Sequence, residues 1–236
     1  MNNPVVTTQP VFYLFIAATI LMSLGYIWGR RRNKRIFLAA FNSMIEVLKP
    51  KDQQFTNIGG LSGYHANIIP RKNRYIRRVD ATITLLPRQS WLYYPFSKMI
   101  RRYDRLFMLF NLSPKAVGVL EEGHMIEHKY SHFMGASIEN VDTLHHEEIE
   151  WGGMTFHLYY ESETVKRELE DARRRLGEPS TLRHLALVPD QDRMWIFMIP
   201  KRGTVHPVID TLTNWFIGTV GARVGAEKQA AEAKKG

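Results

Sequence analysis

The pattern of hydrophobic and polar positions changes at residue 28, where a long apolar run ends and a charged segment begins. Residues Val11 to Trp28 carry no Lys, Arg, Asp or Glu. A helix of this length would be roughly 27 Å long, enough to cross the hydrocarbon core of a bilayer. Because positive residues mark the cytosolic side of a span, the pattern predicts one transmembrane helix at 11–28, with residues 1–10 as a short tail outside and the rest in the cytosol. The cations that set this orientation follow the run directly: Arg30, Arg31, Arg32, Lys34 and Arg35.

After the span, the hydrophobic period changes several times. A basic juxtamembrane helix is predicted over residues 29–50, because apolar residues from Phe37 to Leu48 fall on one helical face and Pro50 ends it. The Gly-rich stretch 57–70 is interpreted as loop or irregular strand. Alternation predicts a half-buried strand over Arg78–Leu86, then a helix over Trp91–Arg102 and a central strand over Arg105–Leu112.

The later part of the chain predicts further strands and two helices. Short strands are predicted over Ala116–Glu121 and Thr155–Tyr160, and a helix capped by Ser162 ends at Gly177. A hairpin follows, over Leu182–Val188 and Met194–Ile199. Without regular strand–helix alternation, the fold class is α+β, a mostly antiparallel sheet with packed helices after the single N-terminal span. We expect a cytosolic α+β domain at 51–205 and a C-terminal helix with a short charged tail at 206–236.

Charge is concentrated in one zone of the chain. The whole chain has a net charge of +9, but residues 29–110 hold 17 Lys or Arg against 4 Asp or Glu. Cations interleaved with aromatic residues such as Tyr75 and Trp91 suit ribosomal RNA or anionic lipid headgroups, and they also suit a merely solvated surface. The candidate contact residues are Arg71, Lys72, Arg74, Arg77, Arg78, Lys98, Arg101, Arg102 and Arg105.

Catalytic motifs are lacking from the sequence. The chain has no cysteine, no G-x-S-x-G elbow, no phosphate-binding glycine fingerprint and no HExxH box. His124, His128 and His132 have a spacing that would align them on one face of a helix, which makes them weak metal-ligand candidates. We therefore predict a non-enzyme without a cofactor, with a metal-dependent membrane enzyme as a distant alternative.

Two aromatic residues are followed by regularly spaced small residues near the C-terminus. Trp215 and Phe216 stand beside a small-residue face made by Gly218, Gly221 and Gly225. Glycines in a helix interior each cost about 1 kcal/mol relative to alanine, so close packing is expected to stabilise this helix. The packing surface is either the chain's own domain or a partner.

Several segments together resemble one family. They are the span followed by 29-GRRRNKR-35, a helix containing Ala40 and Phe41, the strand 78–86, the segment 88-RQSWL-92 leading to Met99–Arg101, the strand 105–112, and 192-DRMWIFMIP-200 before the last helix. This order is similar to that of the calumin family, coiled-coil-domain membrane proteins of the endoplasmic reticulum. In that family the protein pairs with the small protein Asterix in the PAT complex of the multipass translocon.

The resemblance implies a function without catalysis. It implies a membrane-anchored accessory factor that assists insertion or folding of multipass membrane proteins, with the ribosome, the Sec channel and an Asterix-like protein as partners and the last helix on the channel. The family's long acidic lumenal region and long basic tail have no counterpart here, so calcium binding is not expected. The expected location is the plasma membrane of an archaeon or the endoplasmic reticulum of a eukaryote. A membrane-surface protein that binds anionic lipids is the alternative.

Overall fold

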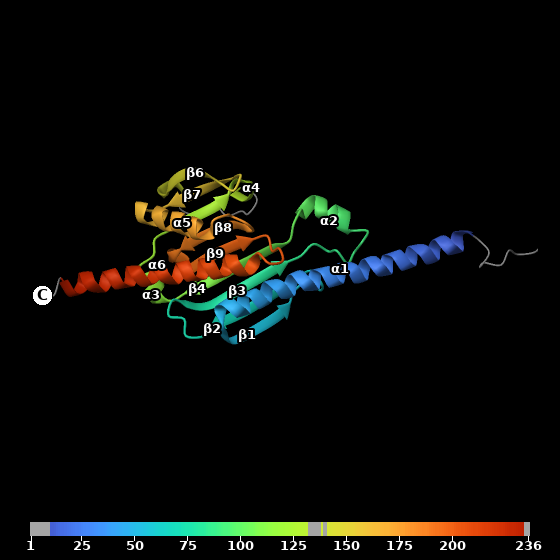
Figure 1. Cartoon of the computed structure of the whole chain (residues 1–236), viewed down its shortest axis with the longest axis horizontal. Helices are drawn as coiled ribbons and strands as arrows, with labels where there is room; N and C mark the ends of the chain where they lie inside the picture. The colour runs from blue at the N-terminus through green and yellow to red at the C-terminus, as the bar shows by residue number, and fades with distance from the viewer. Residues whose placement is uncertain (1–9, 132–137, 139–140, 234–236) are drawn as a thin grey trace, which may run out of the picture.

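The computed structural model describes residues 10–131, 138 and 141–233, and it contains one nine-stranded sheet (Figure 1). Its strand order is β1-β2-β3-β4-β9-β8-β5-β7-β6, and every neighbouring pair is antiparallel. The strands are β1 Pro50–Asn57, β2 Gly63–Pro70, β3 Ile76–Thr84, β4 Arg105–Leu112, β5 Gly123–Glu127, β6 His145–Trp151, β7 Met154–Tyr160, β8 Leu182–Val188 and β9 Arg193–Met198. The predicted α+β class with an antiparallel sheet is confirmed.

Three helices lie side by side over one face of this sheet. α6 (Val205–Ala233) contacts α1 (Pro10–Leu48) on one side and α5 (Glu163–Leu176) on the other, and the core lies between these helices and the strands. Trp215 and Phe216 of α6, with Phe110 of β4, are among the largest side chains fully buried there. The remaining helices are short: α2 Tyr94–Arg101, α3 Pro114–Val117 and α4 His128–Ser131.

α1 is one continuous helix, although the sequence predicted a span and a separate juxtamembrane helix. Its C-terminal part packs on the sheet through Phe41, Met44 and Leu48, which are buried as predicted, and the helix ends two residues before Pro50. The apolar N-terminal part is not buried by the rest of the chain and stands clear of the sheet (Figure 1). The described residues thus contain one helix that is long and apolar enough to cross a membrane.

Two local predictions are wrong, and three strands were missed. The stretch 57–70 contains a regular strand, β2, because its backbone pairs with β1 and β3 along its length. Residues 116–121 form no strand, since Pro114 starts the short helix α3 there and β5 begins only at Gly123. The missed strands are β5, which is buried inside the sheet, and β1 and β6, which are its two edges and carry mostly polar side chains. The hairpin β8–β9 and the Ser162 cap of α5 are confirmed.

A buried ion pair fixes α1 to the sheet. Arg88 donates two hydrogen bonds to the Asp104 carboxylate, both at 2.8 Å, and a third to Asn33 Oδ1 of α1 at 2.9 Å. Asn33 in turn donates to the backbone carbonyls of Leu86 and Leu61, at 2.9 and 3.2 Å. All three polar side chains are buried, so the network links the middle of α1 to the loop after β3 and the start of β4.

Gly29 lets this loop approach α1. A Cβ added at Gly29 would fall on the backbone carbonyl of Arg88, whereas a Cβ added at Gly218 of α6 meets nothing within 4 Å. Both glycines lie inside a helix, so replacement by alanine improves helix propensity equally at the two sites.

We expect Gly29→Ala to lower the free energy of unfolding by about 1–3 kcal/mol through overpacking, and Gly218→Ala to raise it by up to about 1 kcal/mol. Chemical denaturation of the detergent-solubilised chain measures both variants. Equal stabilisation by the two alanines would show that Gly29 is not needed for the contact with the loop.

Candidate functional site: an apolar helix beside a basic groove

α2 exposes large apolar side chains to an unusual degree. Leu92, just before the helix, is 74% exposed, and Phe96, Met99 and Ile100 on the helix are 62, 71 and 70% exposed. Pro95 suits the first turn, and Lys98 and Arg101 occupy the last turn, so the segment has the residues that start and end a helix but buries only Ser97. Exposed apolar groups this dense mark a surface for a membrane or a partner.

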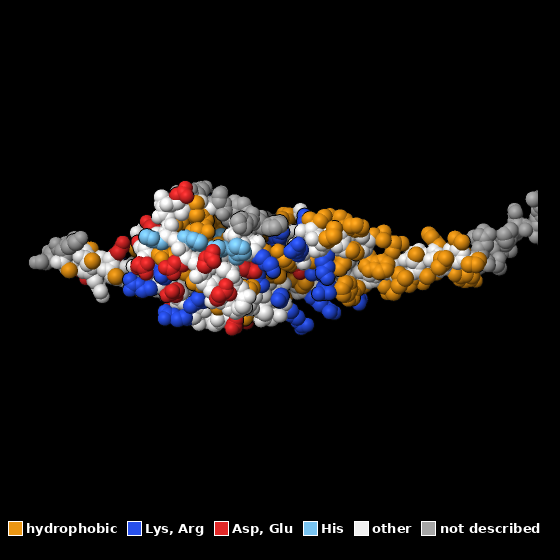
Figure 2. Space-filling view, turned by 90° about the horizontal axis from the view of Figure 1, so that it is seen from above, with side chains coloured by type: hydrophobic (Ala, Val, Ile, Leu, Met, Phe, Trp, Pro, Cys, Tyr) orange, Lys and Arg blue, Asp and Glu red, His pale blue; other side chains and the backbone are white. Residues whose placement is uncertain are grey.

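α2 lies alongside α1 and extends the apolar surface of that helix (Figures 1 and 2). Trp91 packs against α1 at Gly25, where an added Cβ would be 3.3 Å from the ring. α1 in this region exposes Trp28, Ile27 and Leu24 in addition to the apolar residues nearer its start. The two helices therefore present one apolar surface at the end of the sheet where α1 leaves it.

A basic groove of about 940 Å³ opens between these two helices and the loop after β9. Eight Lys or Arg side chains and one carboxylate line it, which gives a formal lining charge of +7. The carboxylate, Asp104, is already paired with Arg88. The remaining cations come from three separate segments of the chain: Arg31, Arg32 and Arg35 of α1, Lys98 and Arg102 at α2, and Lys201 and Arg202 before α6.

The groove combines the two features that anionic amphiphiles recognise. Its cations offer charge-assisted hydrogen bonds to phosphate or carboxylate oxygens, and Leu24, Ile27 and Trp28 supply apolar walls on the side of α1. Arg32 stacks over the Trp28 ring, 5.3 Å from its centroid, which holds one guanidinium at the boundary between the apolar and basic parts. This end of the sheet, with Thr84 and Arg105, is called the groove end below.

The predicted basic zone is divided between two ends of the sheet. Of the nine candidate contact residues, Lys98, Arg101, Arg102 and Arg105 belong to the groove end, while Arg71, Lys72, Arg74, Arg77 and Arg78 surround the turn from β2 to β3. Thr84 follows Arg78 by six positions along β3, a distance of roughly 20 Å. Two of the turn cations also serve the fold, since Arg77 donates to the Leu112 carbonyl and Arg78 pairs with Asp80. This opposite end, with Ile76 and Leu112, is called the far end.

The cations predicted to orient the span all lie on α1. Arg30, Arg31, Arg32, Lys34 and Arg35 are exposed along the part of the helix that follows its apolar segment. Three of them, Arg31, Arg32 and Arg35, line the groove, a role that a topology signal alone does not require.

The prediction that the last helix contacts a partner through its aromatic and glycine residues is wrong in part. Trp215 and Phe216 are 1 and 0% exposed, because they point from α6 into the core, and they are not available to another protein. Gly218 and Gly225 have open space where a side chain would be, and Gly221 lies near the Tyr75 hydroxyl. Only the small-residue part of the predicted contact is thus still accessible.

The three spaced histidines do not line one helix. His124 is buried on strand β5, where its Nε2 lies 2.9 Å from Glu122 Oε1, and it stacks on His184. Burial and the nearby His124 lower the pKa of His184 to about 3, so His184 is neutral. His128 starts α4, and His132 lies outside the described residues.

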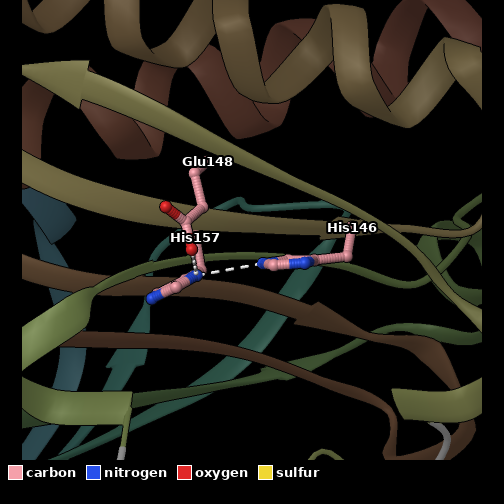
Figure 3. A group of neighbouring side chains, drawn as sticks. All are labelled: His146, Glu148 and His157. Carbon is pink, nitrogen blue, oxygen red and sulfur yellow. Dashed lines mark hydrogen bonds and ion pairs between the residues drawn. The ribbon is translucent and has the colours of Figure 1, made fainter.

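A different group of ligand-type side chains was missed in the sequence (Figure 3). His146 and Glu148 of β6 and His157 of β7 lie together on the face opposite the covering helices, and their ligand atoms all lie within 4.8 Å of one another. The signal was the i, i+2 spacing of His146 and Glu148, which places both on one face of a strand. Glu147 points the other way, where Lys166 and Tyr160 bind its carboxylate and lower its pKa.

No family model matches this chain, and no curated protein matches it either.

Proposed function

We propose that this chain is a membrane-anchored, non-enzymatic accessory factor that assists insertion or folding of multipass membrane proteins. The observation that carries the proposal is the apolar surface shared by α1 and α2 at the groove end. α1 crosses the bilayer with its N-terminus outside, and α2 lies in the headgroup region of the cytosolic leaflet with Leu92, Phe96 and Ile100 toward the acyl chains. The sheet therefore rests on the membrane surface by its groove end.

An interfacial helix beside a span gives such a factor a physical means of action. Apolar side chains of an amphipathic helix enter the headgroup and acyl boundary by roughly 5–10 Å. Local thinning and water defects reduce the cost of moving a polar side chain into a bilayer. Multipass proteins contain spans with such polar residues, and the leaflet beside α1 and α2 is where they would enter at lower cost.

The far end supports a second part of the proposal. Arg71, Lys72 and Arg74 are exposed at the turn between β2 and β3, on the side of the sheet away from the apolar surface. With the groove end on the membrane, these cations point toward the cytosol, where ribosomal RNA at a translocon would lie. The resemblance to the calumin family supports the ribosome, a Sec channel and an Asterix-like protein as partners.

We expect Phe96→Glu to reduce insertion of a multipass substrate several-fold, because a carboxylate on α2 withdraws the helix from the leaflet. The measurement is protease protection of the substrate in vesicles that contain the full-length protein, with translation on ribosomes. The matched control is Val141→Glu. Val141 is 41% exposed and lies two residues before Thr143, which lines a pocket with Pro189 and Asp190 of the β8–β9 turn at the far end. Insertion that is equally efficient with both variants and the unchanged chain would contradict the proposal.

Anionic lipid binding is the second candidate function, and the basic groove favours it. Its seven cations outside the Arg88–Asp104 pair lie beside an apolar wall, which is the arrangement of a phospholipid headgroup site at a membrane surface. This function and ribosome binding use different ends of the sheet, so variants that remove the same number of cations from one end or the other separate them.

We expect the double variant Arg102→Gln, Arg202→Gln to retain less phosphatidylglycerol. The measurement is the amount of this lipid that stays bound when the chain is purified from mixed phosphatidylglycerol–phosphatidylcholine vesicles. Ribosome cosedimentation of this variant should be unchanged. Arg71→Gln with Arg74→Gln removes the same charge at the far end and should do the reverse: ribosome cosedimentation weakens and becomes less sensitive to salt, because fewer phosphate contacts release fewer counterions. Each double variant is the control for the other. Parallel losses in both assays would mean that net charge, and not location, governs binding.

A further inference from the structure

We propose that His146, Glu148 and His157 form a binding site for a divalent transition metal ion, with zinc as the ion that fits best. This inference is independent of the membrane function. It starts from the register of β6 and β7, in which Glu148 is directly opposite His157 and His146 is opposite Tyr159. Residues two apart on one strand share a face, so all three ligand side chains extend from the same side of a rigid antiparallel pair (Figure 3).

The distances suit a tetrahedral ion. His157 Nδ1 lies 2.9 Å from His146 Nε2 and 3.5 Å from Glu148 Oε1. Bonds of about 2.0–2.2 Å in a tetrahedral zinc site place neighbouring ligand atoms roughly 3.3 Å apart, between these two values. All three ligand atoms lie within 4.8 Å of one another, and His146 and Glu148 are exposed, so rotation of these two side chains can bring them to the spacing of a bound ion.

His128 contacts the other ring nitrogen of His157. Its Nδ1 lies 2.7 Å from His157 Nε2, the ring nitrogen that faces away from Glu148 and His146. A histidine that binds a metal through one nitrogen donates the N–H of the other nitrogen to an acceptor, which fixes its tautomer and ring orientation. In the proposed state His157 Nδ1 binds the ion and Nε2–H donates to His128 Nδ1, so His128 is a positioning residue.

The donor set and its exposure indicate the class of ion. Two imidazole nitrogens and one carboxylate oxygen suit zinc and other borderline divalent ions better than magnesium or calcium, which prefer oxygen ligands alone. The His157 side chain is 9% exposed, but that of Glu148 is 60% exposed, so the site is held by a buried ligand and opens to solvent on one side. Water can take the fourth position. The ion joins β6, an edge strand, to its only neighbour in the described sheet, β7.

The test is zinc binding by the full-length protein in detergent, first stripped with chelator and measured by calorimetry. We expect one zinc ion per chain and a rise in the thermal unfolding midpoint with zinc concentration. Glu148→Gln should weaken zinc binding at least tenfold without disturbing the fold, because this side chain is mostly exposed. His128→Gln should weaken it by about 10-fold, the lower end of the effect of losing a partner behind a ligand.

His145→Gln is the matched control for these variants. His145 is the neighbour of His146 on β6 but stacks on Tyr160, on the opposite face of the strand pair, so its loss should leave the affinity unchanged. An unchanged chain that binds no stoichiometric zinc would overturn the proposal. Equal affinities in Glu148→Gln, His145→Gln and the unchanged chain would overturn it as well, because they would place the ion elsewhere.

Discussion

The buried contact between Arg88, Asp104 and Asn33 is the interaction on which the rest of the structure depends. It holds the loop after β3 and the first residues before β4 against the middle of α1, at the point where this helix leaves the sheet. Removing one member of such a buried ion pair typically costs about 3–5 kcal/mol, because the other charge stays buried without a partner. Since α2 lies between Arg88 and Asp104 in the chain, the same contact fixes where α2 lies relative to α1. The apolar surface and the basic groove both follow from that placement.

One consequence is that the two ends of the sheet have different surfaces. The groove end gathers the apolar helices and the groove cations, and the far end has its own exposed cations at Arg71, Lys72 and Arg74. An arrangement of this kind lets a single small domain face an apolar phase at one end and an anionic aqueous partner at the other. In the proposed function these are the bilayer and the ribosome. The histidine cluster lies on the face of β6 and β7 opposite the covering helices (Figure 3).

How far the sequence predicts this structure depends on whether the signal is local. The helix after Ser162 and the hairpin around Pro189 were predictable because caps and turn residues act within a few positions. The edge strands β1 and β6 were not, because their polar side chains give little hydrophobic alternation and their pairing with distant segments makes them strands. The individual cations were visible in the sequence, but the groove needs three segments that only tertiary packing brings together. His157 was missed for the same reason, since its partners depend on strand register.

The central claim is that α2 lies in the membrane surface, and the chain offers a direct measurement because it contains no cysteine. A single cysteine at Ile100→Cys, labelled with a polarity-sensitive fluorophore in the full-length protein in liposomes, reports the surroundings of α2. Lys115→Cys on α3 at the far end reports an aqueous position. The account predicts blue-shifted emission that is shielded from aqueous iodide at position 100, and water-like emission with full quenching at position 115. Water-like emission and full quenching at both positions would contradict it.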